Sequence, residues 1–235
     1  MQCPLDAGTV FSARRNLMSQ QDDKQRAAIE ALNYIEDGCV LGVGTGSTVD
    51  FFIEALPAHA HRLESVVSSS SRSTKKLHRL GVAVAQLDAV GRVDLYVDGA
   101  DEATKRRHLI KGGGGALTRE KVLAGAARRF VCIIDESKLV AILGTFPLPI
   151  EVIPMARTFV ERQMMKAGGR AIWREGFTTD NGNQILDVHD LNITNPLELE
   201  TRFNQIPGIV TVGLFAHRPA DRLLIGSATG VRVID

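Results

Sequence analysis

The sequence predicts an α/β protein in which a Rossmann-like parallel-sheet domain carries a second, smaller α+β domain of the ferredoxin-like type. Two observations predict the larger domain: short strands alternate with helices, and each strand is apolar throughout. Strands of that composition are typical of a parallel sheet that helices cover on both faces. A third observation, the order βαββαβ later in the chain, is that of the split βαβ unit and predicts the ferredoxin-like domain.

In the larger domain, the apolar spacing predicts a helix from Asp22 that ends at Gly38, and then a buried strand over residues 39–43. Ser47, with Asp50 three residues on, is a capping pattern that begins the next helix. The other expected elements are strands at residues 66–67, 82–84, 93–97 and 130–134, a helix around 74–80, and a helix from the glycines at 112–115 to about residue 129.

In the smaller domain, the expected elements are strands at residues 150–153, 171–173, 185–188 and 209–215, with helices at 155–167 and 196–205. Two last apolar runs, at 223–225 and 231–234, are expected to return to the first sheet. The predicted division is a flexible N-terminal extension of residues 1–17, a Rossmann-like domain of residues 18–145 and 221–235, and a ferredoxin-like domain of residues 146–220.

Composition narrows the classes of function. The 28 lysines and arginines against 27 aspartates and glutamates give a net charge of +1, so no overall field favours nucleic acid or an anionic membrane surface. No apolar run approaches the roughly 20 residues that a membrane-spanning helix needs. Cys3, Cys39 and Cys132 are scattered and form no CxxC pair, which supports neither a disulfide framework nor a zinc site. We expect a cytoplasmic protein that binds neither nucleic acid nor membrane.

Four polar segments are candidates for the functional site because each follows a predicted strand, and open α/β sheets bind ligands beyond the carboxyl ends of their strands. The segments are GVGTGST at 42–48, SSSSRST at 68–74, DGADE at 98–102 and KGGGGALTREK at 111–121.

The first segment either lets backbone and helix amides approach an anion or is only a tight turn. It is a poor dinucleotide fingerprint, because the third glycine of GxGxxG falls at Ser47. The second segment either faces the site or is a solvated loop with a helix cap.

The third segment places Asp98, Asp101 and Glu102 within five residues, where carboxylates repel one another and are costly to bury. Magnesium or manganese would explain them. Lys111 and the loop that follows it would also balance their charge without any metal.

The fourth segment combines four glycines with Glu120. The glycines carry a large entropy cost, which either a close approach of backbone to a ligand or a flexible linker would explain. Glu120 lies near the start of the next helix, whose dipole favours the ionised form that a general base needs. The alternative for Glu120 is a charge on the helix surface.

The four segments, in this order, resemble the type A ribose-5-phosphate isomerases. LGTFPLPIEVIPMA at 143–156, TDNGN at 179–183 and IPGIVTVGLFA at 206–216 continue the resemblance, which covers the chain from about residue 20 to its end. DGADE followed by KGGGGALTREK is the most specific part. At Gly115 alanine also occurs in the family, and we expect the turn to tolerate either residue.

The resemblance implies the reversible isomerisation of D-ribose 5-phosphate to D-ribulose 5-phosphate through a cis-enediolate, in the non-oxidative pentose phosphate pathway. It further implies a homodimer that needs no cofactor or metal. The family's base falls on Glu120, its ring-opening or proton-shuttling carboxylate on Asp98, and the polar partners of the O1/O2 end on Asp101 and Lys111. The other implied substrate-binding residues are Lys24, Thr45, Gly46, Ser47, Thr48, Gly99, Ala100, Gly112, Gly113, Gly114 and Lys138.

Two other classes of function fit parts of the sequence. A sugar-phosphate sensor would carry a DNA-binding helix-turn-helix ahead of this fold, for which we expect the first 17 residues to be too few, and it has no need of a base at Glu120. A nucleotide-dependent enzyme would use the glycine loop at 42–48, but it leaves the carboxylates and Lys111 unexplained.

Overall fold

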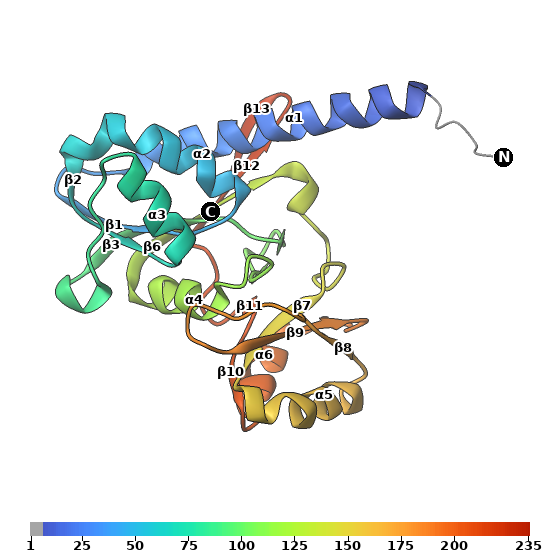
Figure 1. The fold of residues 1–235 in the computed structure, drawn as a ribbon. Helices are drawn as coiled ribbons and strands as arrows, with labels where there is room; N and C mark the ends of the chain where they lie inside the picture. Colours follow the sequence, from blue (N-terminus) through green and yellow to red (C-terminus); the bar gives the residue numbers. More distant parts are fainter. Residues whose placement is uncertain (1–6) are drawn as a thin grey trace.

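The computed structural model describes residues 7–235, with side chains from Ser19 onward, and contains a larger and a smaller domain (Figure 1). The larger domain is built on a six-stranded sheet of order β13-β12-β6-β3-β1-β2, which is parallel except for the pair β12 and β13. Its strands are β1 (Cys39–Val43), β2 (Leu63–Ser68), β3 (Val93–Asp98), β6 (Ala127–Asp135), β12 (Arg222–Ser227) and β13 (Gly230–Ile234). The α/β class predicted from the sequence is confirmed.

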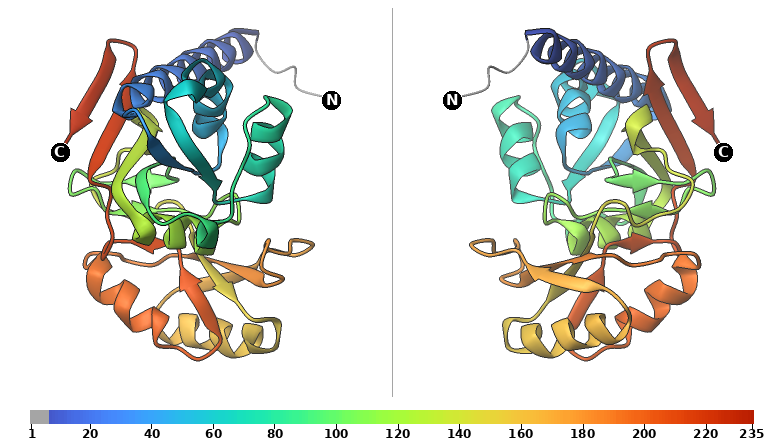
Figure 2. Two further views of the ribbon diagram at one scale, coloured as in Figure 1. Left: turned by 90° about the vertical axis from the view of Figure 1, so that its left-hand side faces the viewer. Right: turned by 90° about the vertical axis from the view of Figure 1, so that its right-hand side faces the viewer.

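Helices cover both faces of this sheet because alternate residues of each strand point to opposite sides. One face packs Leu41 of β1 against Ala28 and Phe52, and the other packs Tyr96 of β3 against Leu123. Figure 2 shows the first helix, α1, along the side of the larger domain that lies farthest from the smaller domain. The helices are α1 (Ala7–Ala31), α2 (Ser47–Ala55), α3 (Ser71–Arg79) and α4 (Leu117–Ala126), with 3-10 turns η1 (Leu32–Tyr34), η2 (Leu56–Arg62), η3 (Leu87–Ala89) and η4 (Glu136–Lys138).

The smaller domain is an antiparallel sheet of order β10-β7-β9-β8 with two helices and its own core. Both β7 and β8 run antiparallel to β9 between them, so they are parallel to each other, as in the predicted split βαβ unit. We propose that the domain boundaries lie at 145/146, just before β7, and at 220/221, just before β12. The elements are β7 (Leu148–Val152), η5 (Pro154–Ala156), α5 (Arg157–Lys166), β8 (Arg170–Trp173), β9 (Gln184–His189), α6 (Pro196–Asn204) and β10 (Ile209–Val212).

The first helix begins at Ala7 rather than near Asp22. Residues 7–21 include two alanines, two arginines, two glutamines and one leucine, all good helix formers, so local propensity continues the helix where no apolar pattern predicts one. Residues 7–17 of the expected flexible extension are therefore helical, and its residues 1–6 lie outside the described part of the chain.

Residues 82–84, predicted to be a strand, form none. Next to β2 the chain makes a single bridge, between Val67 and Ala85, with the Ala85 N–H donating to the carbonyl of Val66 at 2.8 Å. Val82 is buried in the core. The apolar character of Val82 therefore reflects its burial in the core and not pairing in the sheet.

The run at 209–215, predicted to be one strand, divides at Gly213 between two sheets. Beyond Gly213, β11 (Leu214–Phe215) pairs with β5 (Leu109–Ile110), which pairs with β4 (Glu102–Ala103). Gly213 donates its N–H to the carbonyl of Pro149 at 2.7 Å and accepts the N–H of Lys111 at 2.9 Å. The backbone of Lys111 is therefore held where the two domains meet.

Cys39 and Cys132 are free, buried thiols, and Cys3 lies outside the described residues. Within the described part of the chain, no helix has the length and apolar character that crossing a membrane requires.

Candidate active site

A cavity of about 340 Å³ opens where the loops after β1 and β3 meet the glycine loop that precedes α4. Its wall contains every residue predicted for the site except Asp98, which lies completely buried directly behind it. The lining residues are Gln20, Lys24, Thr45, Gly46, Ser47, Thr48, Gly99, Ala100, Asp101, Lys111, Gly112, Gly113, Gly114, Glu120 and Lys138.

Asp98 ends β3, and all four acceptor positions of its carboxylate are occupied. Oδ1 accepts the N–H groups of Thr45 at 3.0 Å and Gly99 at 2.7 Å. Oδ2 accepts the hydroxyl of Tyr96 and pairs with Nζ of Lys111 at 2.7 Å. A Cβ on Gly44 would lie 2.0 Å from Cγ of Asp98, so this glycine of the 42–48 segment makes room for the carboxylate. The close approach there is to a side chain of the protein and not to a ligand.

Lys111 lies between two carboxylates. Its ammonium is 2.7 Å from Oδ2 of Asp98 and 3.3 Å from Oε2 of Glu120, and it donates to the carbonyl of Gly99 at 2.6 Å. Burial alone lowers the pKa of Lys111, but the two carboxylates raise it more, and the net pKa lies above its ordinary value. The side chain is therefore a charged ammonium at the wall of the cavity.

Glu120 is buried in the first turn of α4, as predicted, but its electrostatics differ from the prediction. Burial raises its pKa, Lys111 opposes the rise, and the charges of Asp98 and Asp101 add to it. The effect of burial therefore exceeds that of the helix dipole, which favours the ionised form. Its Oε2 lies within ion-pair distance of Lys111 but has no hydrogen-bond partner among the residues described.

The other two carboxylates of the DGADE segment diverge. Asp101 stays on the cavity wall, where its Oδ2 accepts the N–H of Gly113 at 2.7 Å. Burial raises the pKa of Asp101, while this N–H and the charges of two lysines oppose the rise. Glu102 turns away and accepts the N–H groups of Gly144 and Phe146 at 2.7 and 2.6 Å. Each carboxylate of the segment thus has its own protein donors.

Gly115 contradicts the expectation that its turn tolerates alanine equally well. Its φ is +80°, in the left-handed region that side chains disfavour, and a Cβ there would lie 2.2 Å from the ring of Phe177. Alanine would require that ring to move.

Part of the cavity wall is suited to an anion. Lys24 on α1 and Lys138 in η4 line it, and neither forms an ion pair within the part of the chain whose side chains are described. The predicted cap of α2 is wrong, because Ser47 is the first helical residue and Gly46 at the N-cap offers no side chain. No capping side chain therefore competes with a ligand for the first N–H groups of α2.

Sequence reasoning missed Gln20 and Tyr96. Gln20 lies one helical turn before Lys24, so it shares that face of α1, but the helix was expected to begin only at Asp22. Tyr96 lies two positions before Asp98 in β3, a spacing that puts both side chains on one face of the strand. Its place in an apolar run indicated only a core residue.

The serine-rich segment lies beside the cavity and not in its wall. Ser70 caps α3 by accepting the N–H of Ser73, whose hydroxyl donates to the carbonyl of Gly44 at 2.7 Å. Of the two alternatives for this segment, the helix cap is the one observed. Ser70 and Arg72 line an adjoining cavity of about 440 Å³.

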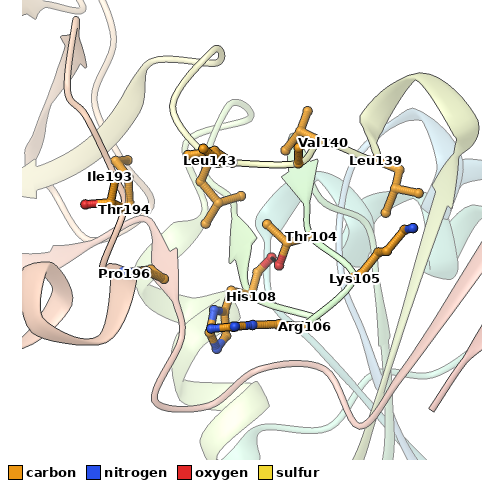
Figure 3. Close-up of a pocket in the computed structure, with 12 residues that line it drawn as sticks. Thr104, Lys105, Arg106, His108, Leu139, Val140, Leu143, Ile193, Thr194 and Pro196 are labelled. Atoms are coloured by element: carbon orange, nitrogen blue, oxygen red, sulfur yellow. Dashed lines mark hydrogen bonds between the residues drawn. The ribbon is translucent and has the colours of Figure 1, made fainter.

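A larger cavity, of about 660 Å³, lies elsewhere, between the β4–β5 turn and residues 139–143 (Figure 3). Lys105, Arg106 and His108 lie along one side of it, and Leu143, Ile193 and Pro196 along another. No carboxylate lines it, whereas the smaller cavity joins carboxylates, an ammonium and an anion-binding end. Chemistry, and not size, identifies the smaller cavity as the candidate active site.

The chain is similar to a family of known proteins and to several solved structures. The model of the family described as ribose 5-phosphate isomerase A (phosphoriboisomerase A) matches residues 65–230. The chain is similar to ribose 5-phosphate isomerase A from Neisseria gonorrhoeae, with 44% identity and a TM-score of 0.90 over 92% of this chain and 96% of that one. It is similar to the enzyme from Methanocaldococcus jannaschii, with 39% identity and a TM-score of 0.87 over 92% and 100% of the chains. It is also similar to a D-ribose-5-phosphate isomerase in complex with phospho-erythronic acid, with 37% identity and a TM-score of 0.88 over 92% and 98%.

Proposed function

The chain belongs to the ribose 5-phosphate isomerase A family, the isomerases of D-ribose 5-phosphate and D-ribulose 5-phosphate, and we propose that it catalyses this reaction in the cavity around Glu120. The observation that carries the proposal is the Lys111 ammonium, which lies between the carboxylates of Asp98 and Glu120 at the cavity wall. The reaction belongs to the non-oxidative pentose phosphate pathway and passes through a cis-enediolate.

Glu120 is the proposed base. The isomerisation moves a proton between C2 and C1 of the open-chain sugar, so one group must take the proton from one carbon and return it to the other. General bases work best when their pKa lies near the working pH. Burial raises the pKa of Glu120 toward that range, and the charge of Lys111 limits the rise.

Lys111 is the proposed stabiliser of the enediolate, because a fixed ammonium beside the reacting oxygens favours the negative charge that develops there. We assign to Asp98 the task of holding Lys111 and the Thr45 amide in place, since no acceptor position of its carboxylate is free. Asp101 lines the cavity and has a raised pKa. We therefore assign the proton transfer between the two oxygens to Asp101 and not, as the resemblance implies, to Asp98.

The phosphate is proposed to bind where Lys24, Lys138 and the first N–H groups of α2 line the cavity. Unpaired lysines supply charge, and a helix N-terminus supplies directed donors. The related isomerase that was solved with phospho-erythronic acid supports a phosphorylated ligand of this size. The sugar would lie between the phosphate site and Glu120, against Gly99, Ala100 and the glycines 112–114.

We further propose that the protein acts in the cytoplasm as a homodimer on small sugar phosphates, without nucleic acid, membrane, metal or cofactor. The near-neutral net charge supports the absence of a nucleic-acid partner. The reaction moves protons and removes no electrons from the substrate, so it requires no redox group. Light scattering of the purified protein would measure its oligomeric state.

The direct test is to incubate the purified protein with D-ribose 5-phosphate and measure ketose formation. A rate proportional to the protein concentration, and lost in Glu120→Gln, is the expected result. Glu175→Gln is the matched control, because Glu175 is an exposed glutamate outside the cavity. Failure of the wild-type protein to form ketose would overturn the proposal.

A further inference from the structure

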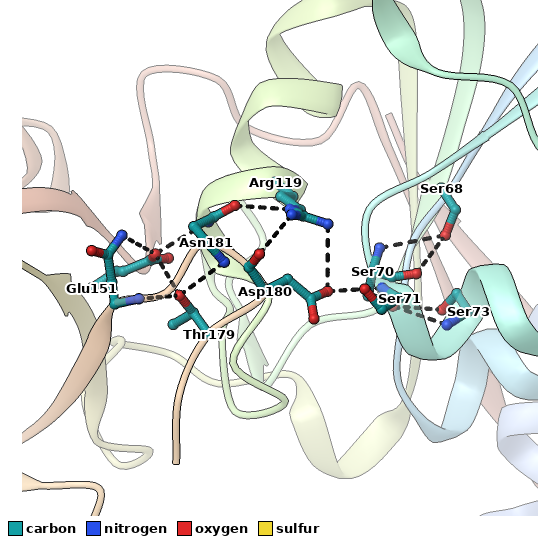
Figure 4. Close-up of polar contacts among 10 residues, drawn as sticks. Ser68, Ser70, Ser71, Ser73, Arg119, Glu151, Thr179, Asp180 and Asn181 are labelled. Carbon is teal, nitrogen blue, oxygen red and sulfur yellow. Dashed lines mark hydrogen bonds and ion pairs between the residues drawn. The ribbon is translucent and has the colours of Figure 1, made fainter.

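A loop of the smaller domain reaches the larger domain beside the active-site cavity. It joins β8 to β9, and its tip lies against the N-terminal ends of α3 and α4 (Figure 4). We call residues 179–183, TDNGN, the hairpin tip. None of these residues lines the cavity that holds Glu120, and Asp180 lines the adjoining cavity, which shares Thr45, Gly46, Ser47 and Gly114 with it.

Arg119 holds the hairpin tip from α4. Its Nε donates to Oδ1 of Asn181 at 2.8 Å, its Nη2 donates to the carbonyl of Asp180 at 2.8 Å, and its Nη1 lies 3.6 Å from Oδ2 of Asp180. Arg119 directly precedes Glu120 in the first turn of α4. The guanidinium therefore fixes the backbone that carries the proposed base.

Asp180 also contacts the N-terminus of α3. Its Oδ2 accepts the N–H of Ser71, the first residue of α3, at 2.8 Å. Ser73, two residues after Ser71, donates its hydroxyl to the carbonyl of Gly44. Thr45, which follows Gly44 in the chain, lines the cavity. One carboxylate thus links the helix that carries Glu120 to the loop at 45–48.

The hairpin tip is itself held by Glu151, which is completely buried in β7. The Glu151 carboxylate accepts the hydroxyl of Thr179 at 2.9 Å and the side-chain amides of Asn181 and Asn183 at 3.1 and 2.8 Å. It also accepts the hydroxyl of Thr118, two residues before Glu120. Several donors on one buried carboxylate orient it strongly, so the tip is a fixed support.

We propose that Asp180 and Arg119 are a positioning pair that sets the place of Glu120 relative to the 45–48 loop. The proposal rests on the role of Glu120 as the base, and it adds two residues that lie outside the wall of the cavity that holds Glu120. Their side chains are 33% and 42% exposed, so their ion pair contributes little stability of its own. Its effect is on geometry, where a displacement of about 1 Å at a reacting group lowers turnover by about 100-fold.

The test compares Asp180→Ala with Glu175→Ala, a matched change of an exposed acidic residue in the same loop. We expect kcat of Asp180→Ala to fall by about tenfold or more, since Glu120 is no longer held at its productive position. KM for ribose 5-phosphate and Kd for phospho-erythronic acid should stay within about threefold, because Asp180 contacts Ser71 and Arg119 and none of the groups of the proposed phosphate site. The melting temperature should shift by only a few degrees, and Glu175→Ala should match the wild type throughout.

Two conservative variants complete the test. Asp180→Asn keeps an acceptor for the Ser71 N–H but loses the charge toward Arg119, and we expect an intermediate kcat. Arg119→Lys keeps the charge but loses the planar fork of donors, and we expect a lowered kcat with unchanged KM. These two variants decide the matter if Asp180→Ala does not fold.

Wild-type kcat in Asp180→Ala, or in both conservative variants, would overturn the positioning role, as would a loss confined to KM. That result is distinct from failure of the proposed function, which would appear as absence of ketose with the wild-type protein or as full activity of Glu120→Gln.

Discussion

Tyr96 donates its hydroxyl hydrogen to Oδ2 of Asp98, the same oxygen that pairs with Lys111 at 2.7 Å. Both Tyr96 and Asp98 are completely buried, and neither lines the cavity. The hydroxyl therefore bears on the reaction through Asp98, which holds the Lys111 ammonium and the Thr45 N–H at the cavity.

The substitution Tyr96→Phe should reveal this connection. Phenylalanine keeps the ring contact with Phe130, whose centroid lies 5.0 Å away, but leaves one acceptor position of a buried carboxylate empty. An unsatisfied buried acceptor costs about 1–3 kcal/mol, so the free energy of unfolding in urea should fall by that amount. Because Asp98 then holds Lys111 less firmly, kcat should also fall by about tenfold, or about 1.4 kcal/mol, while KM stays nearly constant.

The control is Tyr34→Phe, at the protein's other tyrosine. The ring of Tyr34 lies 5.1 Å from the Arg222 guanidinium, and Tyr34 does not line the active-site cavity. This variant should keep the wild-type kcat. If Tyr96→Phe matched it in both stability and kcat, the hydroxyl would have no part in placing Lys111.

The pH dependence of turnover should reflect the raised pKa of Glu120. Burial is the main cause of that rise, and only the ionised form accepts a proton. Activity should therefore fall as the pH is lowered through the pKa of Glu120, and the acid limb of kcat should lie well above the value of about 4.3 for an ordinary glutamate. The profile of kcat is the measurement, because it reports groups in the enzyme–substrate complex.

A phosphate monoester ionises near pH 6 and would produce a limb of its own, chiefly in kcat/KM. The affinity for phospho-erythronic acid, measured over the same pH range, separates that contribution. An acid limb of kcat at the position of an ordinary glutamate would contradict the role of burial at Glu120.

Removal of metal ions should leave turnover unchanged. The carboxylates Asp98 and Asp101 are balanced by the Lys111 ammonium and by backbone N–H groups, and each has protein donors. Exhaustive treatment with a chelator, followed by assay in metal-free buffer, is the measurement. Loss of activity that magnesium or manganese restores would show that a cation is needed.

Much of the site could be predicted because parallel strands bring the loops at their carboxyl ends to one edge of a sheet. That rule places the 45–48 loop and Asp101 in one cavity wall, where the structure has them. The glycines 112–114 reach the same wall from β5, which belongs to the antiparallel sheet β11-β5-β4. It does not say whether a carboxylate at a strand end enters the cavity or lies behind it. Asp98 lies behind because Gly44 leaves it space and Tyr96 supplies a buried donor, and both are features of packing.

The fold was less predictable where tertiary contacts decide the outcome. The apolar run at 209–215 crosses from one sheet to another because Gly213 bonds to both Pro149 and Lys111, partners that are distant in sequence. The serine-rich segment was a candidate for the site with a solvated loop as its alternative, and residues 180–183 of the hairpin tip indicate only a turn. Their connection through Asp180 depends on how the two domains pack, which local patterns do not encode.

The substitution Glu120→Gln tests the centre of the proposed mechanism. The amide keeps the volume of the side chain but cannot accept the proton from carbon. General-base catalysis is worth about 10² to 10⁴-fold, so kcat should fall by at least the lower figure. The proposed phosphate anchor consists of Lys24, Lys138 and the first N–H groups of α2, and Glu120 is not part of it. The Kd for phospho-erythronic acid should therefore stay within about tenfold of wild type, or about 1.4 kcal/mol.

Stability measurements distinguish loss of the base from loss of the fold. The pKa of Glu120 is raised by folding, so this group contributes stability that is fully present below its unfolded pKa and is lost as the pH rises through the folded value. At neutral pH the variant should thus be at least as resistant to urea as the wild type, with Lys111 still paired to Asp98. The wild type, run in heavy water, should incorporate deuterium at the transferred carbon, and Glu120→Gln should not. If the variant kept near-full turnover and exchange, Glu120 would be a buried structural carboxyl, and the base would have to be sought at Asp101, the other carboxylate on the cavity wall.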